Sequence, residues 1–387
     1  MDGRFVSILS GTAWLTAALS LHASELPPVA GWDPAAAARY LDSRMDVWWE
    51  NAKSLQTGSA EAKCISCHTA VPYAWARPAL RRASGVVEPT AHEERILDFV
   101  RRRVEYAASE QPYYDHNEYK KIESRGVEAV LNAFVLTGRD LELGSPEPSA
   151  PTVAAISRLW DVQRGDGAWD WLDFGLEPYE TPDAVFQGAT MAALAVGSEP
   201  GMRASAGDRG RAGLERLRAY FRSSLGSQRL FNRACALLAS SRLEGILTDV
   251  ERETILRDLE WRQRPDGGWS LADLGTWRWT RQEAPPYTPP GVTDSGLLAA
   301  SDGYATGLVV YAMRQAGRAV ESPAVRKGQQ WLREHQAPER ANDPSWAPWR
   351  AHSLNYDREH GGPKGEPWRR MFMSDLATAF AVLALLQ

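Results

Sequence analysis

The sequence predicts an all-α fold, an (α/α)6 double-ring toroid in which six outer helices enclose six inner helices. The first observation is a repeated alternation in which an amphipathic stretch with a charged face is followed by an Ala-rich stretch that is apolar nearly all round. The second is that these stretches form six pairs. The third is that no period-two pattern typical of β-strands competes with them. Half-exposed helices therefore form the outer ring and buried helices the inner ring.

The pair around residue 100 illustrates the pattern. In AHEERILDFVRRRVEYA, Ile96, Val100 and Val104 share one stripe, and SRGVEAVLNAFVL follows as the mostly apolar partner. The predicted outer and inner helices are residues 35–53 with 70–81, 91–108 with 124–137, 151–163 with 184–197, 208–224 with 228–240, 249–263 with 302–316, and 323–336 with 375–386. Because the inner helices are rich in Ala, they can approach closely and leave little void.

The N-terminal segment predicts an exported protein. Residues 1–23 have the layout of a secretory signal peptide, with an apolar run from Phe5 to Leu21 and small residues near Ala23, and residues 24–387 form a single toroid domain. An uncleaved anchor is the alternative, but the run is shorter than the roughly 20 residues that span a bilayer. We expect a periplasmic or secreted bacterial protein with no stable membrane span after processing.

Composition excludes several classes of protein. The chain has 387 residues, of which 44% are hydrophobic, so it can bury a large core and is neither disordered nor collagen-like. Its 49 acidic and 44 basic residues give a net charge of -5, without the basic surface that nucleic-acid binding needs. Three cysteines are too few for a disulfide-stapled scaffold. The 16 Trp residues are the one excess, and most of them lie in a few connecting segments.

Two heptapeptides at the ends of outer helices share the pattern Q-x-x-x-G-x-W. They are QRGDGAW, ending at Trp169, and QRPDGGW, ending at Trp269. A third copy, KGQQWLREHQ, reaches Gln336, but a longer insert that ends at Trp346 replaces its second half. These residues resemble the QW repeats of the squalene-hopene cyclase and prenyltransferase toroid superfamily, over about residues 150–387. The resemblance implies that the Gln and Trp residues are structural, with the Trp stacking where helices end.

Three inner helices open with an acidic residue, Asp183, Asp302 or Asp375. Ser or Thr close before an Asp at a helix start favours a capping role for these residues. Squalene-hopene-type cyclases use a D-x-D-D acid motif and ionising terpene synthases a D-D-x-x-D metal motif, and the sequence contains neither. A zinc site of the prenyltransferase type is poorly supported, because Cys235 is the only cysteine within the repeats. Class II cyclase activity is therefore disfavoured.

The segment KCISCHTAVPYAW contains the pattern C-x-x-C-H, formed by Cys64, Cys67 and His68. It resembles the attachment motif of c-type cytochromes, which implies one haem c per chain, held by both cysteines and ligated at its iron by the His. Export agrees with this, because covalent haem attachment takes place outside the bacterial cytoplasm. A Cys64–Cys67 disulfide and a zinc site are the alternatives, although zinc needs four ligands and no second C-x-x-C is present.

The motif lies in the connection between the outer and inner helix of the first pair. In a double ring all such connections emerge at one end, which we call the mouth, and five of the six are long. They carry most of the Trp residues and candidate ligands, namely His116, Trp169, Trp171, Trp277, Trp279, Trp346, Trp349, His352, His360 and Trp368. We expect these residues and the haem to gather at the mouth, where the N-termini of inner helices favour the haem propionates.

A second axial ligand to the haem iron must also come from the mouth. Ranked by adjacency in the ring, the candidates are His116, then Met373 or Met371, then His360 and His352. No Met follows the motif within several tens of residues, so an ordinary small cytochrome c domain is not expected. An open sixth position is the remaining alternative, and it favours small-ligand or substrate chemistry.

Three classes of function stay open. The first is a monohaem c protein that transfers electrons to a redox partner protein, or a haem-dependent oxidoreductase acting on a small apolar ligand. The second is a cyclase-like or glycan-acting toroid enzyme without haem, since α/α barrels host glycosidases and Trp-rich mouths bind sugars. The third is a binding module without chemistry. The C-x-x-C-H motif and the export signal together favour the first class.

Overall fold

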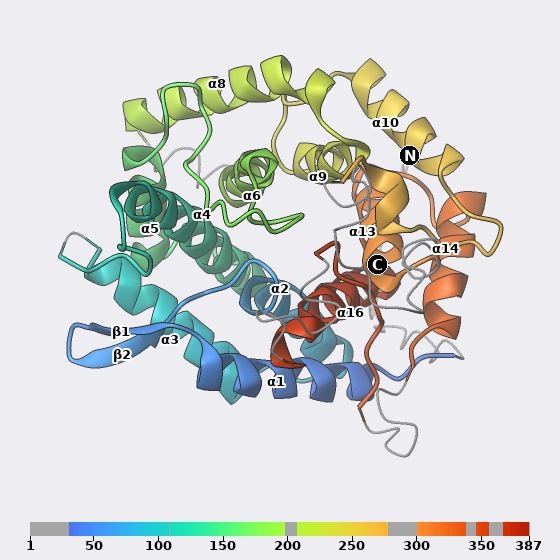
Figure 1. Ribbon diagram of the computed structural model, residues 1–387, viewed down its shortest axis with the longest axis horizontal. Coiled ribbons are helices and arrows are strands. Elements are labelled where there is room, and N and C mark those ends of the chain that lie inside the picture. Colours follow the sequence, from blue (N-terminus) through green and yellow to red (C-terminus); the bar gives the residue numbers. More distant parts are fainter. Residues whose placement is uncertain are drawn as a thin grey trace, which may run out of the picture. The chain divides into compact units, whose positions relative to one another are not determined.

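The computed structural model describes residues 31–107, 109–197, 207–277, 300–337, 346–355 and 367–386. Trp32–Gln387 form one compact unit, and the twelve α-helices of its described residues lie in two concentric rings (Figure 1). The prediction of an all-α double ring is confirmed. The predicted signal peptide, residues 1–23, lies outside the described residues.

All six predicted helix pairs are present. The outer ring consists of α1 (Pro34–Asn51), α3 (Ala91–Glu105), α5 (Ala150–Asp161), α8 (Gly207–Ser224), α10 (Asp249–Trp261) and α14 (Pro323–Glu334). The inner ring consists of α2 (Ala70–Ala83), α4 (Glu118–Leu143), α6 (Val185–Gly197), α9 (Leu230–Ser240), α13 (Gly303–Gln315) and α16 (Phe372–Leu385). Only α4 extends well beyond its predicted bounds, because its charged first turn, EYKK, shows no apolar stripe. Short 3-10 turns occupy η1 (Pro182–Ala184), η2 (Leu225–Ser227), η3 (Leu271–Leu274) and η4 (Pro367–Met371).

The inner helices pack tightly because small residues line their contacts. A Cβ atom added at Gly307 of α13 would lie 2.6 Å from the backbone nitrogen of Ala381 in α16, so only Gly permits this approach. The outer helices bury one face and expose the other. In α10, for example, Leu256 is buried and Trp261 is exposed.

One β-hairpin corrects the expectation that no β structure is present. Strands β1 (Ser54–Thr57) and β2 (Ala60–Lys63) pair antiparallel directly before the C-x-x-C-H motif. Gly58 opens the two-residue loop with a φ of 58°, a left-handed conformation that Gly adopts readily. The strands are four residues each, which is too short for a period-two pattern to stand out.

The first two Q-x-x-x-G-x-W copies form the same clasp at the end of an outer helix. Trp169 is fully buried and donates its indole N–H to the Leu159 carbonyl at 2.8 Å. Trp269 is equally buried and donates to the Leu259 carbonyl, also at 2.8 Å. Each Trp therefore returns the chain onto the helix it has just left.

The Gln of each copy ties this loop to the next outer helix. Gln163 Nε2 donates to the carbonyls of Gly167 and of Gly213 in α8, both at 3.0 Å. Gln263 makes the equivalent pair of bonds to its own loop and to Ala324 of α14, at 2.8 and 2.9 Å. Gln and Trp thus hold neighbouring helices together, as the resemblance implied.

In the third copy, Trp349 rather than Trp346 takes the place of the repeat Trp. Trp349 is fully buried and donates its indole N–H to the Leu332 carbonyl at 2.6 Å. Trp346 instead donates to the Ser43 hydroxyl of α1 at 2.6 Å. The prediction that the insert ends at Trp346 was wrong, because the insertion removes the spacing by which the Trp could be recognised.

Gln336, the Gln of the third copy, closes the ring. Its Nε2 donates to the backbone carbonyl of Asp33 at 2.9 Å, and its Oε1 accepts from the Asp33 N–H at 2.6 Å. The Asp33 carboxylate caps α1 by accepting from the Ala36 N–H at 3.0 Å. The last outer helix is thereby joined to the first.

The two ends of the ring differ in the connections that they carry, as predicted. Five outer-to-inner connections are long and emerge at the mouth, and only the connection from α8 to α9 is short. The opposite end, where the inner helices finish, we call the far end. No helix in the described part of the chain is long and apolar enough to cross a membrane.

The buried position of Trp269 in its clasp predicts that Trp269→Ala and Trp261→Ala change the stability of the protein by different amounts. We expect Trp269→Ala to lower the free energy of unfolding by about 3 to 5 kcal/mol, because it removes a fully buried aromatic side chain. Trp261→Ala is the matched control, since Trp261 is 79% exposed, and should change stability by less than about 0.5 kcal/mol. Urea unfolding followed by far-ultraviolet circular dichroism measures both. Equal effects would contradict the clasp.

Candidate functional site

The C-x-x-C-H motif is held between the hairpin and α2. The Cys64 N–H donates to the Lys53 carbonyl at 2.9 Å, which prolongs the hairpin by one residue pair. The Trp48 indole N–H donates to the Cys64 carbonyl at 2.8 Å, so α1 fixes the start of the motif. Within the motif, the Ser66 hydroxyl accepts from the N–H groups of Thr69 and Ala70, at 3.1 and 3.0 Å. Ser66 therefore caps α2 and folds the motif into a turn.

A chain of hydrogen bonds runs from His68 to a buried carboxylate. His68 Nδ1 lies 3.1 Å from the Thr69 hydroxyl, and that hydroxyl donates to Asp375 Oδ2 at 2.7 Å. Asp375 is ion-paired and accepts only, so the single Thr69 proton points to it. Thr69 must then accept from a protonated Nδ1. This assignment places the lone pair of His68 on Nε2.

Asp375 is held by the first helix pair, more than 300 residues earlier. Arg44 donates from Nε to Oδ1 at 2.7 Å and from Nη2 to Oδ2 at 3.2 Å, and the Tyr40 hydroxyl donates to Oδ1 at 2.7 Å. Asp375 is 1% exposed and Arg44 5%, so this is a buried ion pair with its hydrogen bonds met. The capping role predicted for Asp375 was wrong.

Of the other two acidic residues predicted to cap inner helices, one does so and one does not. Asp302 does cap α13, accepting from the Ala305 N–H at 2.8 Å and from the Leu271 N–H at 2.6 Å. Asp183 lies in η1 and pairs with Arg229 instead of capping a helix.

Aromatic rings surround the His68 imidazole. Phe372, the first residue of α16, stacks on it with ring centroids 3.6 Å apart and an interplanar angle of 20°. Trp48 meets it edge-on at 5.3 Å. The Phe372 contact was not predicted, and its only sequence signal is an aromatic residue beside Met373 at the start of the last inner helix. These rings restrict the orientation of the imidazole.

The two motif cysteines are free thiols and half-buried. Burial raises the pKa of Cys64 to about 12, and the nearby carboxylates of Glu128 and Glu180 add to the shift. Burial also raises the pKa of Cys67. A reactive dithiol needs a lowered pKa, so these thiols are poor nucleophiles in this setting. No group of three His, Cys, Asp or Glu side chains arranged to hold a metal ion occurs among the described residues.

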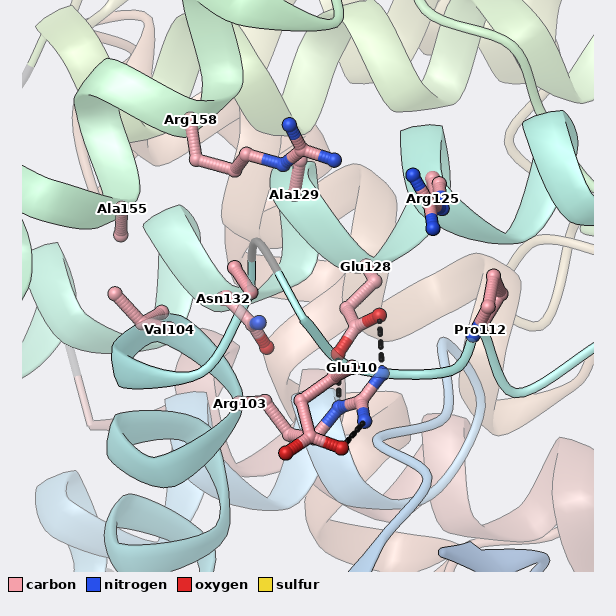
Figure 2. A pocket seen from close by; sticks show the side chains of 11 residues that line it. Arg103, Val104, Glu110, Pro112, Arg125, Glu128, Ala129, Asn132, Ala155 and Arg158 are labelled. Carbon is pink, nitrogen blue, oxygen red and sulfur yellow. Dashed lines mark hydrogen bonds and ion pairs between the residues drawn. The ribbon is translucent and has the colours of Figure 1, made fainter. Parts of the chain in front are cut away.

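An ion-pair cluster lies beside Cys64. A cavity of about 20 Å³ adjoins Cys64 and shares Arg103, Glu128 and Asn132 with an outer crevice of about 30 Å³. Figure 2 shows that crevice, with Arg103 reaching from α3 toward Glu128 and Glu110. Arg103 Nε donates to Glu128 at 2.6 Å. The cluster thus lines both the cavity beside Cys64 and the outer crevice.

Two tyrosines lie on the other side of the motif, near Cys67. Tyr179, from the connection between α5 and α6, hydrogen-bonds through its hydroxyl to Tyr304 of α13. Burial raises the pKa of Tyr179, and nearby Cys235 and Cys67 add to the shift. Sequence patterns missed this pair because its members are 125 residues apart.

Two long connections are tied together across the mouth. Asn355 Nδ2 donates to the Glu177 carbonyl at 2.6 Å, and the Glu177 N–H donates to Asn355 Oδ1 at 2.9 Å. The connection from α14 to α16 therefore braces the one from α5 to α6. The expected gathering of long connections at the mouth is seen here directly.

The candidate distal ligands occupy different settings. His116 is exposed in the loop before α4. Met373 is buried in the first turn of α16, one residue after Phe372, and Met371 is half-buried in η4. His352 is half-buried, close enough to Asp302 to affect its pKa. His360 lies outside the described residues, as does Trp279.

Comparison with solved structures supports the fold. The chain is similar to the crystal structure of an unsaturated glucuronyl hydrolase specific for heparin, with a TM-score of 0.50 and 10% sequence identity, over 91% of this chain and 95% of that chain. At this identity the likeness shows the fold alone, an α/α toroid. No protein-family model matches the chain, and no curated protein matches it.

Asp302 predicts a dependence of stability on pH. Burial raises its pKa to about 6, against hydrogen bonds from backbone N–H groups and the charge of His352, which lower it. A raised pKa means that the folded state binds the proton more tightly than the unfolded state, so stability from this group grows as pH falls through 6.

We therefore expect wild type to gain on the order of 2 kcal/mol relative to Asp302→Asn between pH 7 and pH 4.5. Urea unfolding of both proteins at the two pH values measures the difference, and the contributions of groups that do not interact with Asp302 cancel in the comparison. Parallel pH profiles would mean that Asp302 is ionised throughout.

Proposed function

We propose that the chain is an exported haem c protein in which Cys64 and Cys67 hold one haem and His68 supplies an axial ligand through Nε2. The observation that carries the proposal is the hydrogen-bond chain from His68 through Thr69 to Asp375. It places the proton on Nδ1 and the lone pair on Nε2, which is the tautomer of a His that ligates a metal through Nε2.

The donor set fits haem c in further respects. Both thiols are free, and their raised pKa values argue against a dithiol that cycles with a disulfide. Phe372 and Trp48 hold the imidazole ring, so His68 needs little reordering to act as a ligand. Ser66 and Trp48 bond the backbone of the motif and keep both cysteines next to that imidazole.

The proposal also requires the mouth to provide more space beside Cys64 when haem is bound. The cavity beside Cys64, about 20 Å³, is too small for a porphyrin, and Tyr113, Tyr114 and Leu172 form part of its wall. The connections that carry these residues must therefore close only after haem is attached, or else move outward to admit it. His116 and Met373 are the residues we propose for the distal side, with Met371, His352 and His360 after them.

When bound, haem c supplies one-electron chemistry at its iron. The chain then acts as an electron-transfer protein for a redox partner protein, or in redox chemistry on a small apolar ligand, in the periplasm or outside the cell. In either case Asp375 and Thr69 orient His68, and Arg44 holds Asp375 in place by a buried ion pair.

Haem attachment is tested by staining denaturing gels for haem after expression with a cytochrome c maturation system. We expect stain on wild type and its loss in Cys64→Ser with Cys67→Ser. Cys235→Ser is the matched control, because Cys235 lies in α9 and outside the motif, and should keep the stain. Wild type without stain, or stain that survives loss of both motif cysteines, contradicts the proposal.

The role of Thr69 is tested by the reduction potential. The bond from Nδ1–H makes His68 a stronger donor and stabilises oxidised iron, so Thr69→Val should raise the potential by tens of millivolts. Thr69→Ser keeps the hydroxyl and should restore the wild-type value. Spectroelectrochemical titration of haem-loaded protein measures all three. Equal potentials in Thr69→Val and wild type would show that Thr69 does not act on His68.

A glycan-acting hydrolase is the second candidate, favoured by the structural neighbour, which acts on an unsaturated glucuronyl substrate. The chain offers buried carboxyl groups at its mouth, among them Asp302 with a pKa of about 6. A raised pKa suits a general acid. However, both Asp302 oxygens accept backbone N–H bonds and Asp375 is ion-paired, so neither is placed to meet a substrate freely.

Turnover of an unsaturated heparin disaccharide tests this candidate, followed by the loss of ultraviolet absorbance of its double bond. We expect none. Turnover that Asp302→Asn abolishes, in protein without haem stain, would replace the haem proposal by the hydrolase.

A further inference from the structure

A second cavity opens at the far end of the ring, away from Cys64, Cys67 and His68. Its volume is about 440 Å³, within the range of small-molecule sites. Every inner helix contributes to its wall, through residues in the middle or the second half of the helix: Trp75 and Ala79 from α2, Phe134 and Gly138 from α4, Leu194 from α6, Leu238 from α9, Tyr311 from α13 and Leu383 from α16. The cavity therefore lies on the axis of the ring.

Aromatic rings close the cavity on the side of the mouth. Trp75 contacts Phe134, Tyr311 and Phe380 edge-to-face, with ring centroids 4.9, 5.6 and 5.7 Å apart. Tyr304 continues the stack beyond Phe380 at 5.4 Å. A ligand in the cavity would thus lie on a floor of aromatic faces and edges.

Small residues leave the cavity open. Ala74, Ala79 and Ala195 line it, and Gly138 is exposed within helix α4. A Cβ atom added at Gly138 would meet no atom within 4 Å. Gly in a helix interior costs stability relative to Ala, and here no close packing requires it. Its absence of a side chain does preserve the space.

Two guanidinium groups stand at the rim. Arg82, on α2, is 52% exposed and lies 3.4 Å from Glu142, a carboxylate that Arg81 and Arg139 already bind. Arg242, just after α9, has no side-chain hydrogen bond or ion pair within the described ranges. Helices α2 and α9 are not neighbours in the ring, so the two cations approach the cavity from different sides. Because Arg only donates hydrogen bonds, it requires an acceptor.

We propose that the far-end cavity binds an amphipathic anion, with its apolar body against Trp75, Phe134 and Tyr311 and its carboxylate or phosphate at Arg82 and Arg242. The site is separate from the motif at the mouth, so it does not depend on whether haem is bound there. Its wall combines aromatic and aliphatic side chains with the polar side chains of Thr137, Glu142 and Gln315, besides the two arginines.

Three probes with twelve-carbon chains test the inference on the full-length protein by calorimetry, each below its solubility limit or micelle concentration. They are dodecanoate, dodecanol and dodecyltrimethylammonium. We expect dodecanoate to bind at least about tenfold more tightly than dodecanol, a difference of about 1.4 kcal/mol, and the ammonium probe to bind most weakly. Equal binding of all three, or no binding of dodecanoate, overturns the proposal.

Variants locate the binding. Gly138→Phe should fill the cavity and abolish dodecanoate binding, whereas Gly138→Ala, which adds one methyl group, should largely keep it. Arg82→Gln with Arg242→Gln should remove the preference for dodecanoate over dodecanol, and exposed Arg257→Gln in α10 is the control. Because Arg82 also complements the C-terminus of α2, its loss can lower stability, but a purely structural role leaves the preference between head groups unchanged. Unchanged binding in Gly138→Phe places the probe elsewhere and overturns the proposal.

Discussion

The clasp between a Gln and a Trp at the end of an outer helix is the interaction on which the rest of the structure depends. The Trp returns the chain to the helix it left, and the Gln bonds the following outer helix, as Gln163 does with Gly213. Each clasp therefore sets the angle between successive pairs. The third clasp differs in its partner, since Gln336 bonds Asp33 at the start of α1 and converts a row of helix pairs into a ring.

Ring closure also builds the site at the mouth. It brings α16 beside the first pair, where Asp375 meets Arg44, Tyr40 and Thr69. A buried ion pair contributes little net stability, but removing one partner is costly because a charge is left without compensation. The network around Asp375 is thus better suited to fixing the positions of its side chains than to adding stability. What it positions is His68, whose tautomer follows from the charge of Asp375.

Local sequence patterns predicted the helices and failed where the deciding contact is distant. Periodicity located the twelve helices seen in the described ranges, because burial on a helix repeats every three to four residues. The capping rule was right for Asp302, whose partner Ala305 is three residues away, and wrong for Asp375, whose partner Arg44 is 331 residues away. The role of Trp349 as the repeat Trp was missed because an insertion changes its spacing from Gln336. The hairpin was missed because its strands are short. The motif Cys64-x-x-Cys67-His68 could be found from sequence, but the Thr69 and Phe372 contacts that orient it could not.

The two ends of the ring differ because the same six helices present different residues along their length. Near the mouth, polar side chains meet the starts of the inner helices, as Asp302 does at α13 and Ser66 at α2. Toward the far end, Ala74, Ala79, Gly138 and Ala195 leave space, and the axis widens into a cavity that Arg82 and Arg242 also line. Helix α2 spans both regions, with His68 just before its first turn and Trp75 on the cavity floor. One helix therefore carries residues of both regions, and the two regions differ because its successive turns face different neighbours.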